Sequence, residues 1–162
     1  MGIPISIIGL RDIISEIPEG NLIVAASSIS PVNTIFTQKI AMGAVKKGYP
    51  TTYVTSRTAQ EVREQIMYYQ NESAHDMRIV EERSPMRWKD YIGNQSLMVI
   101  DSFSYLVLEL SLGEVRIILE EFLHSCQEKN SVVFLTMEEG MLDRRIEIAA
   151  SHLADGIFQF MK

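Results

Sequence analysis

Residues 21–34 read NLIVAASSISPVNT, and this stretch decides the fold. The run from Asn21 to Ala26 is short, continuous and apolar, as expected for a central strand buried on both faces. Residues 27–33 are rich in turn-forming side chains, and apolar residues at helical spacing follow from Thr34 until Gly48. The stretch therefore predicts a strand, a loop and a helix in direct succession.

Strand and helix patterns alternate along the rest of the chain. Further strands are predicted at residues 51–55, 77–80, 97–101, 132–136 and 156–161. Helices are predicted at residues 8–14, 34–48, 59–69, 84–91, 113–128 and 142–153. This alternation predicts an α/β fold with a mostly parallel sheet covered by helices on both faces. A chain of 162 residues fits a single domain that spans residues 1–162.

Composition and charge exclude several classes of protein. Apolar residues make up 46% of the chain and charged residues 22%, which is ordinary for a folded domain and excludes a disordered one. The net charge is −6 and the basic residues are scattered, which argues against binding to nucleic acid. No run approaches the roughly 18 apolar residues that a membrane span needs, and no secretory leader is evident. The sequence therefore predicts a cytoplasmic protein.

The residue types that bind metals or attack substrates form no motif. Cys126 is the only cysteine, so neither an intrachain disulfide nor a cysteine-based metal site is expected. The three histidines share no metal-binding spacing, and no G-x-S-x-G motif accompanies the serines. We therefore predict no metal site and no nucleophilic catalysis.

The loop after the first strand lies where a phosphate-binding loop lies in nucleotide-binding α/β proteins. Against the motif G-x-x-x-x-G-K-[ST], Ser27 and Val32 replace glycines, Asn33 replaces the lysine, and only Thr34 matches. Val32 disfavours positive φ, Pro31 removes an amide donor, and Asn33 supplies no positive charge. These changes together predict that the loop binds nucleotide only weakly.

Several segments resemble the KaiC-like ATPases, in particular those associated with the archaellum motor. The segment VIDS at residues 99–102 is similar to the Walker B strand of that family. The other resembling segments are IPEGNLIV at 17–24, AMGAVKKGY at 41–49, YVT at 53–55, LTMEEG at 135–140 and LADGI at 153–157. The resemblance spans nearly the whole chain and suggests an archaeal origin.

The resemblance implies a fold and a mode of assembly. The fold is a three-layer α/β/α sandwich with a RecA-like P-loop NTPase core and the strand order 5-1-4-3-2. Members of the family assemble side by side into rings with nucleotide at the subunit boundary. Self-association, or mixed assembly with a protein partner, is therefore expected.

The resemblance also implies where the remnant of a nucleotide pocket lies. Its residues would be Ser27, Ser30, Asn33, Thr34 and Asp101, without any catalytic residue. The family carries acidic residues just after the second strand, where this chain has Ser56-Arg57, so the hydrolytic base is also expected to be lost.

The retained polar residues each have a simpler interpretation as well. Thr34 is expected to cap or open its helix rather than to bind magnesium. Asp101 either keeps a functional role at the end of its strand or accepts hydrogen bonds from nearby loop amides. Glu138 and Glu139 are candidate sensors, but they also fit a solvated strand end.

Three functions follow, in order of preference. The first is a catalytically inactive KaiC-like module, a pseudo-ATPase without cofactor that acts through protein contacts as a regulatory or scaffold subunit. The second is an ATP-binding protein or slow ATPase, in which Ser30, Thr34, Asp101 and Lys39 rebuild a pocket for ATP and magnesium. The third is an accessory protein of DNA recombination, against which the acidic balance argues.

Overall fold

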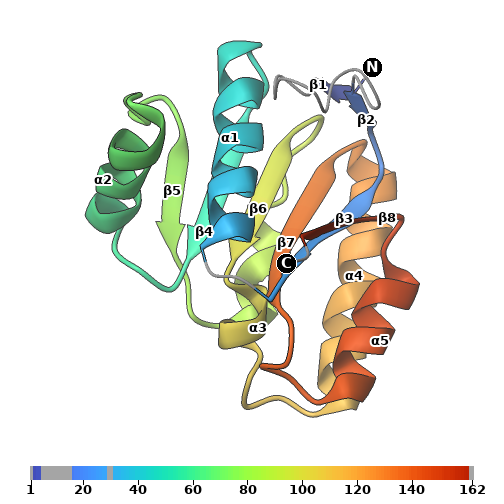
Figure 1. Cartoon of the computed structure of the whole chain (residues 1–162). Coiled ribbons are helices and arrows are strands. Elements are labelled where there is room, and N and C mark those ends of the chain that lie inside the picture. The colour runs from blue at the N-terminus through green and yellow to red at the C-terminus, as the bar shows by residue number, and fades with distance from the viewer. Residues whose placement is uncertain (1, 5–15, 29–30, 161–162) are drawn as a thin grey trace.

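The computed structural model describes residues 2–4, 16–28 and 31–160 (Figure 1). Its strands are β1 (Gly2–Pro4), β2 (Glu16–Pro18), β3 (Leu22–Ser27), β4 (Thr51–Thr55), β5 (Arg78–Glu81), β6 (Leu97–Asp101), β7 (Val132–Glu138) and β8 (Gly156–Phe160). Its helices are α1 (Val32–Lys46), α2 (Ala59–Gln70), the 3₁₀-helix η1 (Pro85–Tyr91), α3 (Phe103–Leu106), α4 (Leu112–Lys129) and α5 (Arg144–Leu153). The helix predicted at residues 8–14 lies outside the described residues.

Six strands form one sheet in the order β5-β4-β6-β7-β3-β8, and every neighbouring pair is parallel. Counting the strands β3, β4, β6, β7 and β8 as 1 to 5 gives the order 5-1-4-3-2, so the predicted order is confirmed. The short strand β5 adds to the outer edge of β4. Strands β1 and β2 form a separate antiparallel ribbon.

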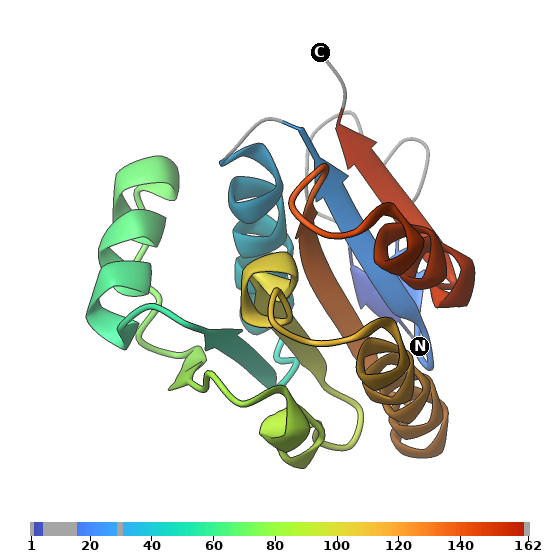
Figure 2. The same cartoon turned by 90° about the horizontal axis from the view of Figure 1, so that it is seen from below.

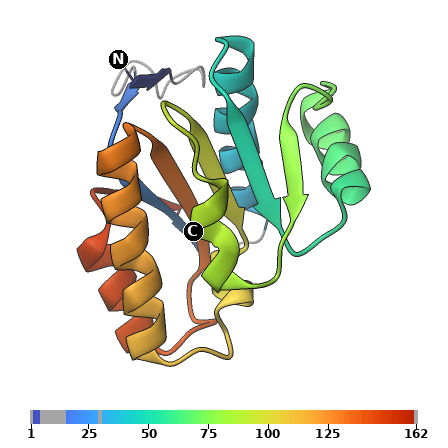
Figure 3. The same cartoon turned by 180° about the vertical axis from the view of Figure 1, so that it is seen from behind.

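Helices cover both faces of the sheet, which confirms the three-layer sandwich (Figures 1 and 3). Helices α1 and α2 pack on one face through residues such as Phe36 and Ile66. Helices η1, α4 and α5 pack on the other, where Trp88 and Phe122 stack with ring centroids 6.0 Å apart. Alternate residues of β3 point into the two cores, because successive side chains of a strand face opposite sides.

Helix α4 shows how closely the sequence pattern predicts local structure. Its buried stripe contains Val115, Ile118, Leu119, Phe122 and Cys126, at the spacing that the sequence gives. Ser111 and Glu114 form a capping box at its start, and Asn130 ends it in the left-handed conformation. The Cys126 side chain is fully buried, and this burial raises the pKa of its thiol to about 12.

Some boundaries differ from the prediction. The helix expected to begin at Thr34 begins at Val32, because the Ile35 amide donates to the Pro31 carbonyl oxygen at 3.0 Å. The helix expected at residues 84–91 is a 3₁₀-helix with Pro85 in its first turn. Strands β1 and β2 and the short helix α3 are not predicted by the sequence pattern.

The parallel arrangement brings the carboxyl ends of β3, β4, β6 and β7 to one edge of the sheet. The chain turns from β3 into α1 at this edge, so the amino end of α1 lies there too (Figure 1). Ligands of open α/β sheets bind at this edge, and most candidate residues of the sequence lie on it.

Candidate functional site

Asp101, the last residue of β6, accepts hydrogen bonds from three hydroxyl groups. The Thr34 Oγ1 atom of α1 donates to Oδ1 at 3.1 Å, and Thr136 Oγ1 of β7 donates to the same oxygen at 2.8 Å. The Tyr53 hydroxyl of β4 donates to Oδ2. Burial and the neighbouring Asp101 carboxylate hold the pKa of Tyr53 well above its usual value, so this hydroxyl remains a donor. One carboxylate therefore connects three elements of the fold to its own strand.

The expected role of Thr34 as a helix cap is wrong. Pro31 occupies the N-cap position of α1, and Thr34 is already the third residue of the helix. Thr34 thus lies within the first turn of α1, and its hydroxyl donates to Asp101 instead of capping the helix. Asp101 is likewise bound to hydroxyl groups rather than to the loop amides considered from the sequence.

Asn33, at the position of the P-loop lysine, points into the protein. Its side chain is fully buried, and Nδ2 donates to the Met137 carbonyl oxygen at 3.3 Å. Its Oδ1 accepts from the backbone amide of Thr34 at 2.9 Å. A donor on one side and an acceptor on the other fix the orientation of the side-chain amide. The backbone amide of Thr34, in the first turn of α1, thus already has a hydrogen-bond acceptor within the chain.

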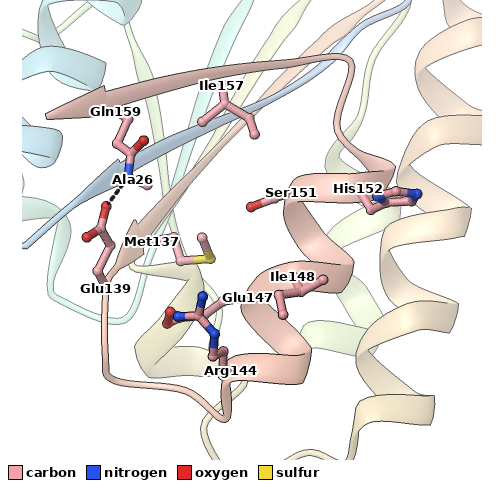
Figure 4. A pocket seen from close by; sticks show the side chains of 10 residues that line it. All are labelled: Ala26, Met137, Glu139, Arg144, Glu147, Ile148, Ser151, His152, Ile157 and Gln159. Carbon is pink, nitrogen blue, oxygen red and sulfur yellow. Dashed lines mark hydrogen bonds between the residues drawn. The ribbon is translucent and has the colours of Figure 1, made fainter.

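Glu138 and Glu139 follow each other in sequence but lie in different surroundings. Glu138 accepts a hydrogen bond from Ser102 Oγ at 2.5 Å and lines the same pocket as Asp101. Its burial, and after it the Asp101 charge, raise the pKa of Glu138 above its usual value. Glu139 accepts from Gln159 Nε2 at 2.9 Å beside β8, in a separate hollow (Figure 4). The structure therefore separates the two candidate sensors.

The pocket beside Asp101 has a volume of about 440 Å³. It extends from the amino end of α1 to the loops that follow β4 and β5. Its charged lining residues are Arg57, Glu61, Arg83, Asp101 and Glu138. The lining thus contains three carboxyl groups and two guanidinium groups.

Sequence reasoning missed some of these residues. Glu61 and Arg83 come from α2 and from the loop after the edge strand β5, and neither belongs to a motif. Tyr53 and Thr136 were also missed. Arg57 is the exception, because it occupies the position where the resembling family carries an acidic residue.

The other candidate residues are placed as follows. Ser27 ends β3 and is buried, while Ser30 lies outside the described residues. Lys39 is exposed on α1 and does not belong to the described lining of the pocket. The rebuilt pocket considered from the sequence therefore cannot use Lys39 in this arrangement.

Two kinds of feature are absent from residues 2–4, 16–28 and 31–160. These residues contain no group of three His, Cys, Asp or Glu side chains that could hold a metal ion. Within the same ranges, none of the helices has the length and apolar character needed to cross a membrane.

Comparison with known proteins places this fold. No family model matches the chain, and no curated protein matches its sequence. The flagellar accessory protein FlaH from Methanocaldococcus jannaschii superposes with a TM-score of 0.75 and 18% identity, over 99% of this chain and 81% of FlaH. The KaiC-like protein PH0186 from Pyrococcus horikoshii OT3 gives a TM-score of 0.74 and 18% identity, over 100% of this chain and 83% of that protein.

A third solved structure, described as an ATPase domain, gives a TM-score of 0.73 and 13% identity, over 100% of this chain and 76% of that domain. At these identities the likeness concerns the fold. The chain therefore has the KaiC-like, RecA-type ATPase fold that its sequence predicts.

Proposed function

We propose that this chain is a KaiC-like module that neither binds nor hydrolyses ATP and acts through protein contacts as a regulatory or scaffold subunit. The observation that carries the proposal is the position of Asn33. Its neutral side chain is buried and bound to Met137, so no cation reaches the pocket from the position of the P-loop lysine. Its side-chain oxygen also accepts the hydrogen bond of the Thr34 backbone amide.

Both features weaken phosphate binding for a physical reason. A phosphate-binding loop works by presenting backbone amides and a lysine to the phosphate oxygens. Here Pro31 has no amide hydrogen and the Thr34 amide is engaged by Asn33. The carboxyl groups of Glu61, Asp101 and Glu138 also line the pocket, and they would repel a triphosphate. Binding and positioning of ATP therefore lack their main sources of free energy.

The comparisons are compatible with an accessory role. FlaH, one of the similar structures, is described as a flagellar accessory protein. A role of that kind, in which the chain supports another protein, requires the fold and its surfaces but not hydrolysis. An archaeal origin agrees with the organisms of FlaH and PH0186.

Thermal unfolding with and without Mg-ATP tests this proposal. We expect the same midpoint in both. A ligand at about 100 times its dissociation constant would add about 2.7 kcal/mol of stability, which is several degrees in a domain of this size. A shift of that size in the wild-type protein, or release of phosphate, would overturn the proposal.

A matched variant shows whether the assay detects binding in this fold. Ser27→Gly/Val32→Gly/Asn33→Lys restores the glycines and the lysine of the motif in their original register. A shift in this variant alone would show that the three replacements account for the loss. Protein partners should bind the variant Val32→Gly/Asn33→Lys as well as the wild type, because the proposed contacts do not involve the loop.

The second candidate function is binding of an anionic ligand without hydrolysis. It is favoured by Arg57 and Arg83, which line the pocket near the amino end of α1, where the helix dipole favours negative charge. This candidate predicts that Mg-ATP or inorganic phosphate raises the midpoint, and that Arg57→Ala/Arg83→Ala removes the effect. The third candidate, DNA recombination, predicts a complex with single-stranded DNA that weakens as salt is added.

A further inference from the structure

The outer edge of β8 is a surface that takes no part in the pocket beside Asp101. Strand β8 pairs with β3 on one side, from Ile23↔Gly156 to Ser27↔Phe160. It is the last strand of the sheet, and among the described residues no strand pairs with its other side (Figure 2). Strand edges of this kind present backbone donors and acceptors that can pair with another chain.

The direction of these backbone groups follows from the way β3 pairs with both of its neighbours. The amides of Val133 and Glu139 in and after β7 donate to the carbonyl oxygens of Asn21 and Ser27, so Val24 of β3 faces β8 instead. In a parallel pair, alternate residues direct both their N–H and their C=O to the same neighbour. Because Val24 lies opposite Ile157, its partners are Gly156 and Phe158, and the backbone groups of Gly156, Phe158 and Phe160 point to β3. Those of Ile157 and Gln159 point away from the sheet.

Strand β8 also lacks the devices by which proteins protect an edge. Its sequence, GIFQF, contains no charged residue and no proline. The opposite edge strand, β5, has Arg78 and Glu81 at its ends and is followed directly by Glu82 and Arg83. Charged residues on an edge strand discourage pairing with another chain. The two edges of one sheet thus differ in the chemistry that controls association.

The two faces of β8 are covered differently. Phe158 and Phe160 pack on Phe36 of α1, with ring centroids 5.0 and 4.9 Å apart. On the other face, Ile157 is 47% exposed and lies over a hollow of about 460 Å³ between β8 and α5 (Figure 4). Ile148 of α5 lines the same hollow and is 54% exposed. Apolar surface therefore remains beside the unpaired backbone.

We propose that a second copy of this chain pairs with β8, strand against antiparallel strand, about a two-fold axis at Phe158. In this register Phe158 faces Phe158 of the second copy, and Gly156 faces Phe160. The backbone of Ile157 lies opposite that of Gln159 of the second copy, and both direct their backbone groups outward, so the pair would form about four hydrogen bonds and leave none of these groups unused. The two sheets would become one continuous sheet.

The side chains are compatible with this register. Ile157 faces Gln159 of the second copy on the side of the hollow, and no pair of like charges meets across the axis. The Phe160 ring comes to lie beside Gly156, where an aromatic side chain covers the backbone of an edge glycine. A shift of the register by one residue would instead place residues whose backbone groups point outward opposite residues whose backbone groups point to β3. Such pairs cannot form hydrogen bonds with each other. Because β8 is complementary to itself in this register, a second copy of the chain fits its edge.

This inference rests on the proposed function, because it names one protein contact of the module. It does not depend on the nucleotide pocket. Loss of dimerisation would overturn this inference alone, whereas stabilisation by ATP would overturn the proposed absence of nucleotide binding alone.

The test measures the molar mass of the full chain by light scattering over a wide range of concentrations. We expect the mass to rise from 18.4 kDa towards twice that value as the concentration increases. Hydrogen exchange should show that the amides of Ile157 and Gln159 become protected with concentration. The amides of Phe158 and Phe160 should be protected at every concentration, since they bind β3.

Two variants with opposite charge patterns test the register. Ile157→Lys/Gln159→Lys places like charges opposite each other across the axis, and this variant should stay monomeric. Ile157→Glu/Gln159→Lys differs only in the sign at one position and places opposite charges there, so it should dimerise. Ile117→Lys on α4 is the control, because Ile117 is similarly exposed at 54% and does not line the hollow. This control should dimerise like the wild type.

A wild-type chain that stays monomeric at all concentrations would overturn the proposal. A dimer that both double variants leave intact would place the contact on another surface and would also overturn it. Complete protection of the Ile157 and Gln159 amides at every concentration would indicate that something other than a second copy covers this edge, and would also overturn the proposal. Circular dichroism of each variant shows whether its monomer is folded, so loss of the fold is not mistaken for loss of the dimer.

Discussion

The pocket of this protein has two walls that differ in how much of the fold depends on them. The first wall is Asp101 with its three hydroxyl donors, which join β4, β6, β7 and α1. The second wall contains Arg57 and Arg83, in the loops that follow β4 and β5, and Arg57 occupies the position where the resembling family carries an acidic residue. Polar groups that hold several elements together are costly to lose, whereas a loop that only contacts a ligand can change freely. Asp101 holds several elements of the fold together, so its loss would destabilise the protein. This explains why the first wall, and not the second, keeps the chemistry of the resembling family.

The largest effect is expected from Asp101→Ala. The substitution leaves the hydroxyls of Tyr53 and Thr34 without their acceptor, leaves Thr136 only the Ile100 carbonyl oxygen at 3.3 Å, and should destabilise the fold by about 3 kcal/mol. Urea unfolding measures this difference. Asp101→Asn is the control, since it keeps one acceptor oxygen and should cost less. Equal stability of Asp101→Ala and the wild type would show that this wall has no structural role.

A smaller loss is expected from Tyr53→Phe. This side chain is fully buried, and the substitution removes only the hydroxyl that donates to Asp101. The loss should be about 1–1.5 kcal/mol, because two other donors continue to bind the carboxylate. The double variant Tyr53→Phe/Asp101→Ala should lose less stability in urea unfolding than the two separate losses added together, since the partners share one interaction. Additive losses would argue against the cluster.

Glu138→Gln is expected to stabilise the protein at neutral pH, by less than about 1 kcal/mol. Burial raises the pKa of Glu138 in the folded state, so the folded protein binds the proton more tightly than the unfolded chain does. The wild type therefore loses stability as the pH rises from the ordinary glutamate pKa through the raised one. The advantage of Glu138→Gln should be present above this window and disappear below it. Unfolding curves over a pH series measure it, and an advantage that persists in acid would contradict this account.

The smallest effect is expected from the arginines on the rim of the pocket. Arg57→Ala should change the free energy of unfolding by less than about 0.5 kcal/mol, because Arg57 is exposed. The same unfolding experiment as for Asp101→Ala gives a direct comparison of the two walls. A loss as large as that of Tyr53→Phe would show that the second wall also supports the fold.

The sequence predicts the sheet better than it predicts the site. The apolar runs of the central strands and the stripe of α4 each have one periodicity, and the strand order follows from the family resemblance. Asp101 and Thr34 were recognised because they remain at motif positions. Tyr53 and Thr136 were not, because tyrosine and threonine are ordinary strand residues and only the packed sheet brings their hydroxyls to Asp101.

Other parts of the site depend on contacts that are distant in sequence. Arg83 reaches the pocket because β5 pairs with β4, and the sequence gives β5 no place in the order of strands. The inward orientation of Asn33 depends on the Met137 carbonyl of β7, a residue 104 positions away. Local patterns contain no information on either contact, since both follow from how the strands are ordered.

The buried thiol of α4 gives this chain an internal reporter. Cys126 is the only cysteine of the chain, it is fully buried, and its pKa of about 12 leaves almost no thiolate at neutral pH. An alkylating reagent can therefore modify the native protein only when the core between α4 and the sheet opens. The labelling rate then measures the free energy of that opening without any engineered probe, for the wild type and for every variant described above.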